Sequence, residues 1–244
     1  MIGVVTTLNK KLHKAYGHKF FETYNWPFDL TVFSEDMLGI PHYPKITDVR
    51  SIYDEIPECE EFVNRNKHRQ PRSSFEEKGL DFISDGVRFC YKVYAYTDMI
   101  INNYDYEGLI AIDADSIFYN PIDEDWIKKH IHRDDSMMTY LGRGNHYSEC
   151  GFLYWNLKHK DTLAYAHRMR SLYDTDIIYK LKEQHDSFIW DYARKEFEAR
   201  GTKNHDIGDG KLGHVQSRSI LGTIYDHTKG PRKLKGRSPE ARVK

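Results

Sequence analysis

The chain has 244 residues, enough for one sizeable α/β domain, and no long Gly/Ser-rich or Pro-rich stretch indicates a linker to a second one. Its 36 Lys and Arg nearly balance its 37 Asp and Glu, so the formal charge of −1 indicates neither a nucleic-acid nor a membrane partner. Three widely spaced cysteines without a CxxC pair argue against a disulfide framework and against a zinc cluster.

The first part of the chain predicts a strand, a helix and a second strand. Residues 2–6 form a β-branched run, residues 10–23 have apolar side chains at helical spacing, and residues 30–33 are again apolar. Such a β-α-β start favours a parallel sheet. Residues 37–80 contain four prolines and a basic cluster, and there we expect a long irregular excursion or lid.

The rest of the chain continues the alternation of strands and helices. We expect strands at 108–112, 136–140, 151–157 and 219–225, and helices at 86–101, 126–131, 162–173 and 186–200. A single domain is therefore expected over residues 1–233. Residues 234–244 have the composition of a flexible basic tail.

Two features concern the compartment. No apolar run approaches the length of a membrane span, so we expect no transmembrane segment. The N-terminus opens directly on a predicted strand, without the basic and apolar regions of a signal peptide. Free thiols are then the default, and we expect a soluble, cytoplasmic protein.

The central feature is the run from 108 to 118, in which an apolar strand ends in Asp113 and Asp115. Residues two apart on an extended chain point the same way, so both carboxylates can face one point beyond the carboxyl end of the strand. Two hard oxygen donors at one point suit Mg²⁺ or Mn²⁺. The same Asp-x-Asp spacing recurs at 123–125 and 174–176, but in polar surroundings typical of solvated turns.

Four landmarks follow one another along most of the chain: the DxD motif Asp113-Ala114-Asp115, Glu149-Cys150-Gly151 at the start of an apolar strand, the helix start at 186–191, and His-x-x-Gly-x-x-Lys at 227–233. The helix before the DxD motif carries two basic residues, Lys92 and Arg88. In this order the landmarks resemble those of metal-dependent nucleotide-sugar glycosyltransferases of the GT-A fold, nearest to the galactosyltransferase and glycogenin-like group.

The resemblance implies an α/β fold of GT-A type, with a mixed, mostly parallel sheet flanked by helices. It implies a nucleotide-diphosphate sugar as donor, with UDP as the default, and a metal held by Asp113, Asp115 and His227. Oxygen and imidazole ligands together favour Mn²⁺ over Mg²⁺. The positions that the resemblance places at the donor are Thr6, Thr7, Glu35, Arg88, Lys92, Asp113, Ala114, Asp115, Lys229, Gly230 and Lys233.

The acceptor side departs from the family pattern. Glu149 stands where the family has asparagine, and Ser187 stands where it has glutamine, so the acceptor can be a glycan, a lipid or a protein. Retention of configuration is the family expectation. Glu149 or Asp186, placed beside the acceptor hydroxyl, would instead serve as the general base of an inverting reaction, and both outcomes stay open.

The third metal ligand has competitors in the sequence. His-x-x-Gly-x-x-Lys also occurs at 205–211, where it contains two acids that would repel a diphosphate and where no clear strand precedes His205. His227 is expected to follow a strand and lies among Lys and Arg, so we favour it. His214 is a further candidate.

Three other functions share parts of this pattern. A phosphatase of the haloacid-dehalogenase type would use Asp113 as a nucleophile, but the motif lies in mid-chain and no later acidic pair with a preceding Lys follows. A sugar nucleotidyltransferase would need a glycine-rich basic loop after the first strand. A non-enzymatic phosphate or nucleic-acid binder would act through residues 229–244, which contain seven Lys and Arg against one acid but no recognition motif. We therefore expect no nucleic-acid partner.

Overall fold

The computed structural model describes residues 1–36, 40–43, 45–46, 48–70, 80–102, 105–230, 232–235 and 238. Within these ranges, seven strands form one sheet in the order β3-β2-β1-β4-β7-β6-β8. They are β1 (Ile2–Thr7), β2 (Asp29–Ser34), β3 (Asp48–Ser51), β4 (Gly108–Ile112), β6 (Met138–Arg143), β7 (His146–Asn156) and β8 (His205–Asp206). A separate pair consists of β5 (Ser116–Phe118) and β9 (Tyr225–His227).

The strand β7 makes the sheet mixed. It runs antiparallel to both of its neighbours, β4 and β6, whereas all other adjacent strands in the sheet are parallel. All five residues of β4 are buried, as expected for a central strand with helices against both faces. The predicted α/β fold with a mixed, mostly parallel sheet is confirmed.

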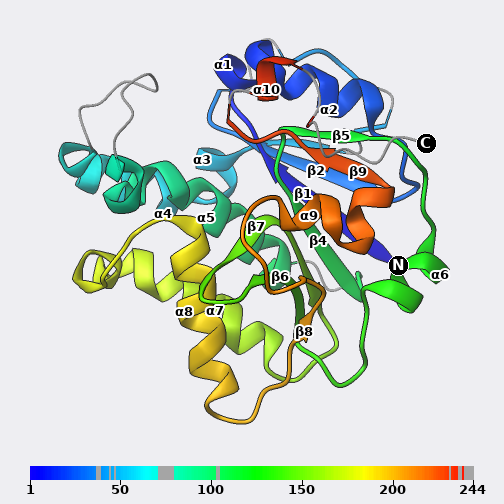
Figure 1. Ribbon diagram of the computed structural model, residues 1–244. Helices are drawn as coiled ribbons and strands as arrows, with labels where there is room; N and C mark the ends of the chain where they lie inside the picture. The colour runs from blue at the N-terminus through cyan, green and yellow to red at the C-terminus, as the bar shows by residue number, and fades with distance from the viewer. Residues whose placement is uncertain are drawn as a thin grey trace.

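Helices cover both faces of the sheet (Figure 1). One face packs against α4 (Pro57–Asn66), α5 (Gly86–Asn102), α7 (Thr162–Asp174) and α8 (Asp186–Glu198). The other packs against α1 (Lys10–Leu12), α2 (His18–Thr23), α6 (Glu124–His130) and α9 (Val215–Arg218). Neighbouring residues of a strand point to opposite faces of the sheet. Val5 and Leu109 belong to the first core, and Val4 and Ile110 belong to the second.

Most elements expected from periodicity occur at or near the expected place. The helix expected at 10–23 is formed by α1, a π-helical turn (His13–Gly17) and α2. The helices expected at 86–101, 126–131, 162–173 and 186–200 correspond to α5, α6, α7 and α8. These segments are amphipathic over several turns, and a long periodic pattern identifies a helix without knowledge of its neighbours.

The prediction of an irregular excursion over residues 37–80 is wrong for 48–69. This stretch contains β3, α3 (Ile52–Glu55), α4 and a 3-10 turn (Lys67–Arg69). Its one proline, Pro57, is consistent with a helix start, because it occupies the first position of α4, where no backbone N–H is needed. Residues 37–39, 44, 47 and 71–79 lie outside the described residues, and the lid stays a prediction.

The strand expected at 219–225 is also wrong over most of its length. Ile220–Thr223 is a 3-10 turn, and its first backbone N–H groups are capped by Ser219, whose Oγ accepts from Leu221 N at 3.2 Å. A side chain at position 222 would clash with the Ser217 carbonyl, so the tight turn requires glycine there. The strand begins only at Tyr225, and His227 is its last residue.

The C-terminal segment after residue 233 is only partly described. Arg232–Lys235 forms the short helix α10, and Ser238 is buried with its backbone N–H donating to Asp226. Ser238 therefore packs against the domain, contrary to a flexible tail at that position. The rest of 234–244 lies outside the described residues.

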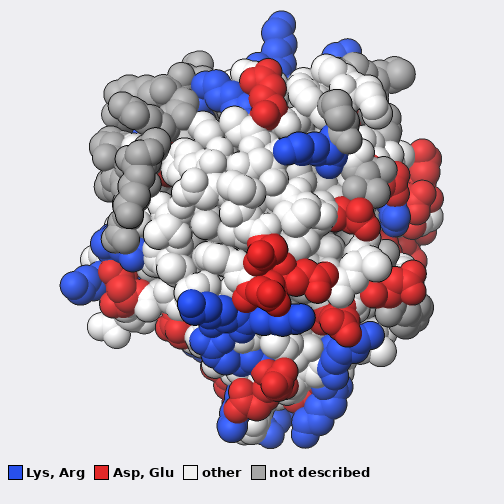
Figure 2. Space-filling view, turned by 90° about the vertical axis from the view of Figure 1, so that its right-hand side faces the viewer, with Lys and Arg blue, Asp and Glu red and all other residues white. Residues whose placement is uncertain are grey.

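Three further observations bear on the compositional expectations. All three cysteines are free and buried. Among the described helices, none has the length and apolarity needed to cross a bilayer. On the face shown in Figure 2, acidic and basic side chains lie intermixed beside a broad uncharged area, in keeping with the near balance of charge in the sequence.

Candidate functional site

A cavity of about 630 Å³ opens at the carboxyl ends of β1, β2 and β4. This is the edge at which open α/β sheets bind ligands, and the volume is typical of a small-molecule site. The sequence-predicted residues that line it are Thr7, Glu35, Arg88, Lys92, Asp113, Ala114, Asp115, Asp186, His227, Lys229, Gly230 and Lys233.

The DxD motif is a turn between two strands. β4 ends at Ile112, and the Asp113 backbone N–H donates to the Gly151 carbonyl at 3.1 Å. The chain then turns, and the Ser116 backbone N–H donates to the Asp113 carbonyl at 3.2 Å. The chain continues as β5. β5 pairs antiparallel with β9, so that Ser116 lies opposite His227. This pairing brings the C-terminal histidine to the DxD turn.

Asp113, Asp115 and His227 form a group whose ligand atoms all lie within 4.8 Å of one another. His227 Nε2 lies 3.0 Å from Asp115 Oδ1 and 3.5 Å from Asp113 Oδ2. Two carboxylates and one imidazole are a suitable donor set for a divalent ion such as Mn²⁺. The residues present fit a metal, and the group is a possible divalent-metal site.

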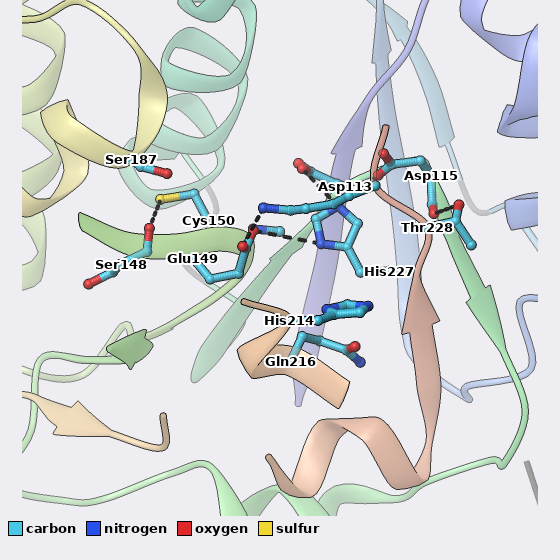
Figure 3. Close-up of polar contacts among 12 residues, drawn as sticks. Asp113, Asp115, Ser148, Glu149, Cys150, Ser187, His214, Gln216, His227 and Thr228 are labelled. Atoms are coloured by element: carbon cyan, nitrogen blue, oxygen red, sulfur yellow. Dashed lines mark hydrogen bonds and ion pairs between the residues drawn. The ribbon is translucent and has the colours of Figure 1, made fainter. Parts of the chain in front are cut away.

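Two residues, Glu149 and Gly151, lie on the Nδ1 side of the His227 imidazole. His227 Nδ1 points toward Glu149, whose Oε1 lies 3.7 Å away (Figure 3). A Cβ atom on Gly151 would lie 2.2 Å from the imidazole ring, so only glycine leaves room for His227. Burial disfavours the charged imidazole, but the Asp115 carboxylate outweighs it and raises the pKa of His227.

Three lysines surround the carboxylates. Lys92 Nζ lies 2.6 Å from Asp113 Oδ1 and 2.8 Å from Asp186 Oδ2. Lys233 Nζ lies 2.7 Å from Asp115 Oδ2, and Lys229 is paired with Glu149. The cavity therefore presents cationic and anionic groups side by side, so it can take a cation on its carboxylates and an anion on its lysines.

The two carboxylates predicted near the acceptor lie in different environments. Asp186, the first residue of α8, lines the cavity, whereas Glu149 is buried behind His227 and is not part of the lining. Burial works against ionisation of both, but Lys92 lowers the pKa of Asp186 to about 2, and Lys229 lowers that of Glu149 to about 2. Both are ionised at neutral pH.

At the other end of the cavity, the structure corrects part of the prediction for the donor-binding residues. Thr7 and Glu35 line the cavity, but Thr6 is fully buried and does not. Successive strand residues point to opposite faces, so Thr6 and Thr7 cannot both face the same ligand. Asn9 was missed: it lines the cavity, caps α1 and donates to Glu35 Oε1 at 3.2 Å. Its position as a cap after a strand was a usable signal.

The competing histidines lie elsewhere. His205 lies in β8, with its Nδ1 at 3.2 Å from the Ile131 carbonyl, and it is not part of the cavity. As expected, no strand precedes His205: the element before it is α8, and His205 itself opens the two-residue strand β8, which pairs with β6. His214 is buried, with Nε2 at 3.4 Å from Asp226 Oδ1 and 3.1 Å from Ser238 Oγ. Of the three candidates, His227 is the one that meets the DxD carboxylates.

Replacement of Lys92 by Met is expected to destabilise the protein. The change leaves Asp113 and Asp186 facing each other without their cation in a mostly buried site, and breaking such a pair costs about 3 kcal/mol. Urea unfolding would measure the loss. The matched control is Lys203→Met, which removes an equally short but exposed pair with Asp135 and should change stability little because solvent screens it. Equal losses in both variants would contradict the expectation.

No protein-family model matches the chain, and no curated protein matches it in sequence. Among solved structures, the chain is similar to the apo form of mouse xyloside xylosyltransferase 1, with a TM-score of 0.46 and 10% identity over 85% of this chain and 86% of that one. It is also similar to the glycosyltransferase GlyE of Streptococcus pneumoniae TIGR4, with a TM-score of 0.46 and 13% identity over 86% of this chain and 46% of GlyE. Both of these similar proteins are glycosyltransferases.

Proposed function

We propose that this chain is a metal-dependent glycosyltransferase that transfers a sugar from a nucleoside-diphosphate sugar, with UDP as the nucleoside diphosphate. One observation carries the proposal: Asp113, Asp115 and His227 converge in a cavity whose lining also includes Lys92, Lys229 and Lys233. A cation site next to several ammonium groups matches a ligand that carries both a metal and a diphosphate.

The reaction requires stabilisation of the negative charge that develops on the leaving diphosphate. A divalent ion on Asp113, Asp115 and His227, Mn²⁺ in preference to Mg²⁺, would act as a Lewis acid toward the phosphate oxygens. Lys92 and Lys233 would neutralise the remaining phosphate charge by exchanging their present carboxylate partners for phosphate. Arg88 and Lys229 line the same cavity and would supply further positive charge to neutralise the diphosphate.

The remaining residues are assigned by their place in the cavity. Thr7, Asn9 and Glu35 would contact the nucleoside, because they line the cavity at the carboxyl ends of β1 and β2. Asp186 would face the acceptor hydroxyl. Glu149 would act indirectly, by orienting the His227 imidazole from its Nδ1 side.

A thermal-shift screen of nucleoside diphosphates and nucleotide sugars, each with and without Mn²⁺, tests the proposal. A ligand that binds only the native state stabilises it by about 2.7 kcal/mol at a hundred times its Kd. We expect one nucleoside diphosphate to raise the melting temperature only when Mn²⁺ is present. Absence of any shift, together with hydrolysis of a generic phosphate ester, would favour the phosphatase instead.

The assignment of the third ligand makes a comparative prediction. His227→Ala should weaken Mn²⁺-dependent binding of the nucleoside diphosphate by more than about tenfold, the lower limit for changes close to a metal. His205→Ala should leave it unchanged, because His205 lies in β8 outside the cavity. Titration calorimetry of both variants measures the difference. The reverse order would reassign the ligand to the copy of the motif at 205–211.

A further inference from the structure

A row of aromatic side chains leads away from the cavity along α8. Phe82, His185, Tyr147, Phe188 and Tyr192 follow one another with ring centroids 5.7, 5.4, 5.3 and 6.0 Å apart. Phe82 is 42% exposed, and Tyr147, Phe188 and Tyr192 are partly exposed, whereas His185 is buried and links Phe82 to Tyr147 from below the surface. We call these five residues the aromatic strip.

The far end of the aromatic strip borders a shallow hollow of about 340 Å³. Its lining is part aromatic and part charged: Tyr147, Phe188, Asp191, Tyr192, Lys195 and Glu196. Glu196 is held in place by Arg168, whose Nε and Nη2 donate to its two oxygens at 2.7 and 2.8 Å. Beside the strip, Glu183 accepts from the Tyr147 hydroxyl at 2.8 Å and contacts His185 Nε2 at 2.8 Å. Fixed hydrogen-bonding groups thus flank the exposed rings.

The near end of the aromatic strip belongs to the cavity. Phe82 is part of the cavity lining, and His185 immediately precedes Asp186, whose carboxylate also lines it. A ligand lying along the strip would therefore end beside Asp186 and the paired Lys92. The strip connects the surface of α8 with the position from which an acceptor would approach.

We propose that the aromatic strip binds a neutral saccharide chain that serves as the acceptor, an inference that rests on the proposed glycosyltransferase function. The apolar C–H faces of sugar rings stack on aromatic rings, while their hydroxyls can donate to nearby acceptors such as the Glu183 and Glu196 carboxylates. A lipid tail would need an enclosed apolar channel, whereas the hollow mixes rings with acids and bases. Glu196 is paired with Arg168 and Glu183 with Lys182, so the strip does not select for charge.

The test uses the full chain loaded with Mn²⁺ and UDP on a printed array of neutral and acidic oligosaccharides, with phosphatidylcholine vesicles as a second probe. Wild type should bind neutral oligosaccharides. Tyr192→Ala should weaken this binding about tenfold, the effect of one lost stacking ring, and Tyr192→Phe should retain it. The matched control is Trp126→Ala, which removes a partly buried ring that packs on His130 of α6, away from the aromatic strip.

The outcomes separate this inference from the proposed function, because nucleotide binding is measured on the same variants. Nucleotide binding in the presence of the metal should be equal in wild type and Tyr192→Ala. A protein that binds the nucleotide but no oligosaccharide, or whose Tyr192→Ala variant binds oligosaccharides as well as wild type, would overturn the inference. Vesicle binding that is lost in Tyr192→Ala would assign the strip to a lipid. Saccharide binding without metal-dependent nucleotide binding would overturn the proposed function and with it the acceptor role.

Discussion

Replacement of Asp115 by Asn is expected to abolish metal-dependent nucleoside-diphosphate binding while the protein stays folded. Asp115 is buried, and its carboxylate lies 3.0 Å from His227 Nε2 and 2.7 Å from Lys233 Nζ. An amide keeps the size of the side chain but removes the charge that makes a carboxylate a ligand for a hard cation. Because changes next to metal ligands already cost 10–100-fold in affinity, loss of a ligand should cost at least about 100-fold.

The backbone contact of Asp115 explains why the variant should fold. The Asp115 carbonyl accepts from both the backbone N–H and the hydroxyl of Thr228, at 2.9 and 2.6 Å, and neither bond involves the carboxylate. Circular dichroism would verify folding, and titration calorimetry with Mn²⁺ and UDP would measure affinity. The control is Asp125→Asn, in the exposed Asp-x-Asp at the start of α6. This variant should change neither the folding nor the affinity for Mn²⁺ and UDP. Unchanged affinity in folded Asp115→Asn would remove the metal site from the proposal.

Replacement of Gly151 by Ala is expected to lower both stability and metal affinity. The added methyl group would lie 2.2 Å from the His227 ring, and the imidazole is held on its other side by Asp115 and Asp113. Overpacking of a buried site costs about 1–3 kcal/mol, and the ring can make room only by leaving the carboxylates. Urea unfolding and Mn²⁺ titration would measure the two effects.

A second glycine provides the control for this prediction. Gly86 opens α5, where the atom nearest to an added Cβ would be the Tyr179 hydroxyl at 3.2 Å, a much smaller overlap than the 2.2 Å approach at Gly151. Ala is also the better helix former, so Gly86→Ala should be nearly neutral. If Gly151→Ala unfolded at the same urea concentration as wild type and kept its metal affinity, the assigned position of His227 would be wrong.

The two predictions depend on one feature of the fold. The short pair of β5 and β9 joins the DxD turn to the C-terminal strand, and the Thr228 bonds to the Asp115 carbonyl extend that pairing by one residue. The metal ligands are therefore 112 positions apart along the chain between Asp115 and His227, yet they are fixed in one local structure.

The local features of this protein could be predicted from its sequence. The buried strand β4 and the two carboxylates after it are adjacent in the chain, so the apolar run and the alternation of side chains already placed Asp113 and Asp115 at one point. The long helices α5, α7 and α8 were found for the same reason, because amphipathic periodicity is a property of the segment itself.

Short segments were harder because their conformation depends on neighbours. The stretch 48–69 was misread because Pro57 resembles a break, although it starts α4. Ile220 and Leu221 have apolar side chains that suit a strand or a buried turn equally well. The burial of Phe62 against Tyr94 of α5 and Tyr173 of α7 stabilises α4, and this contact is not encoded in the segment alone.

The partners of the DxD motif were decided by tertiary structure. His205 and His227 head the same motif in the sequence, but β8 lies at the sheet edge beside β6, whereas β9 pairs with the strand that follows Asp115. The aromatic strip likewise combines rings from three separate segments. Chemical type and local spacing are short-range properties of the sequence, but which residues converge depends on long-range pairing and packing, and these exist only in the folded chain.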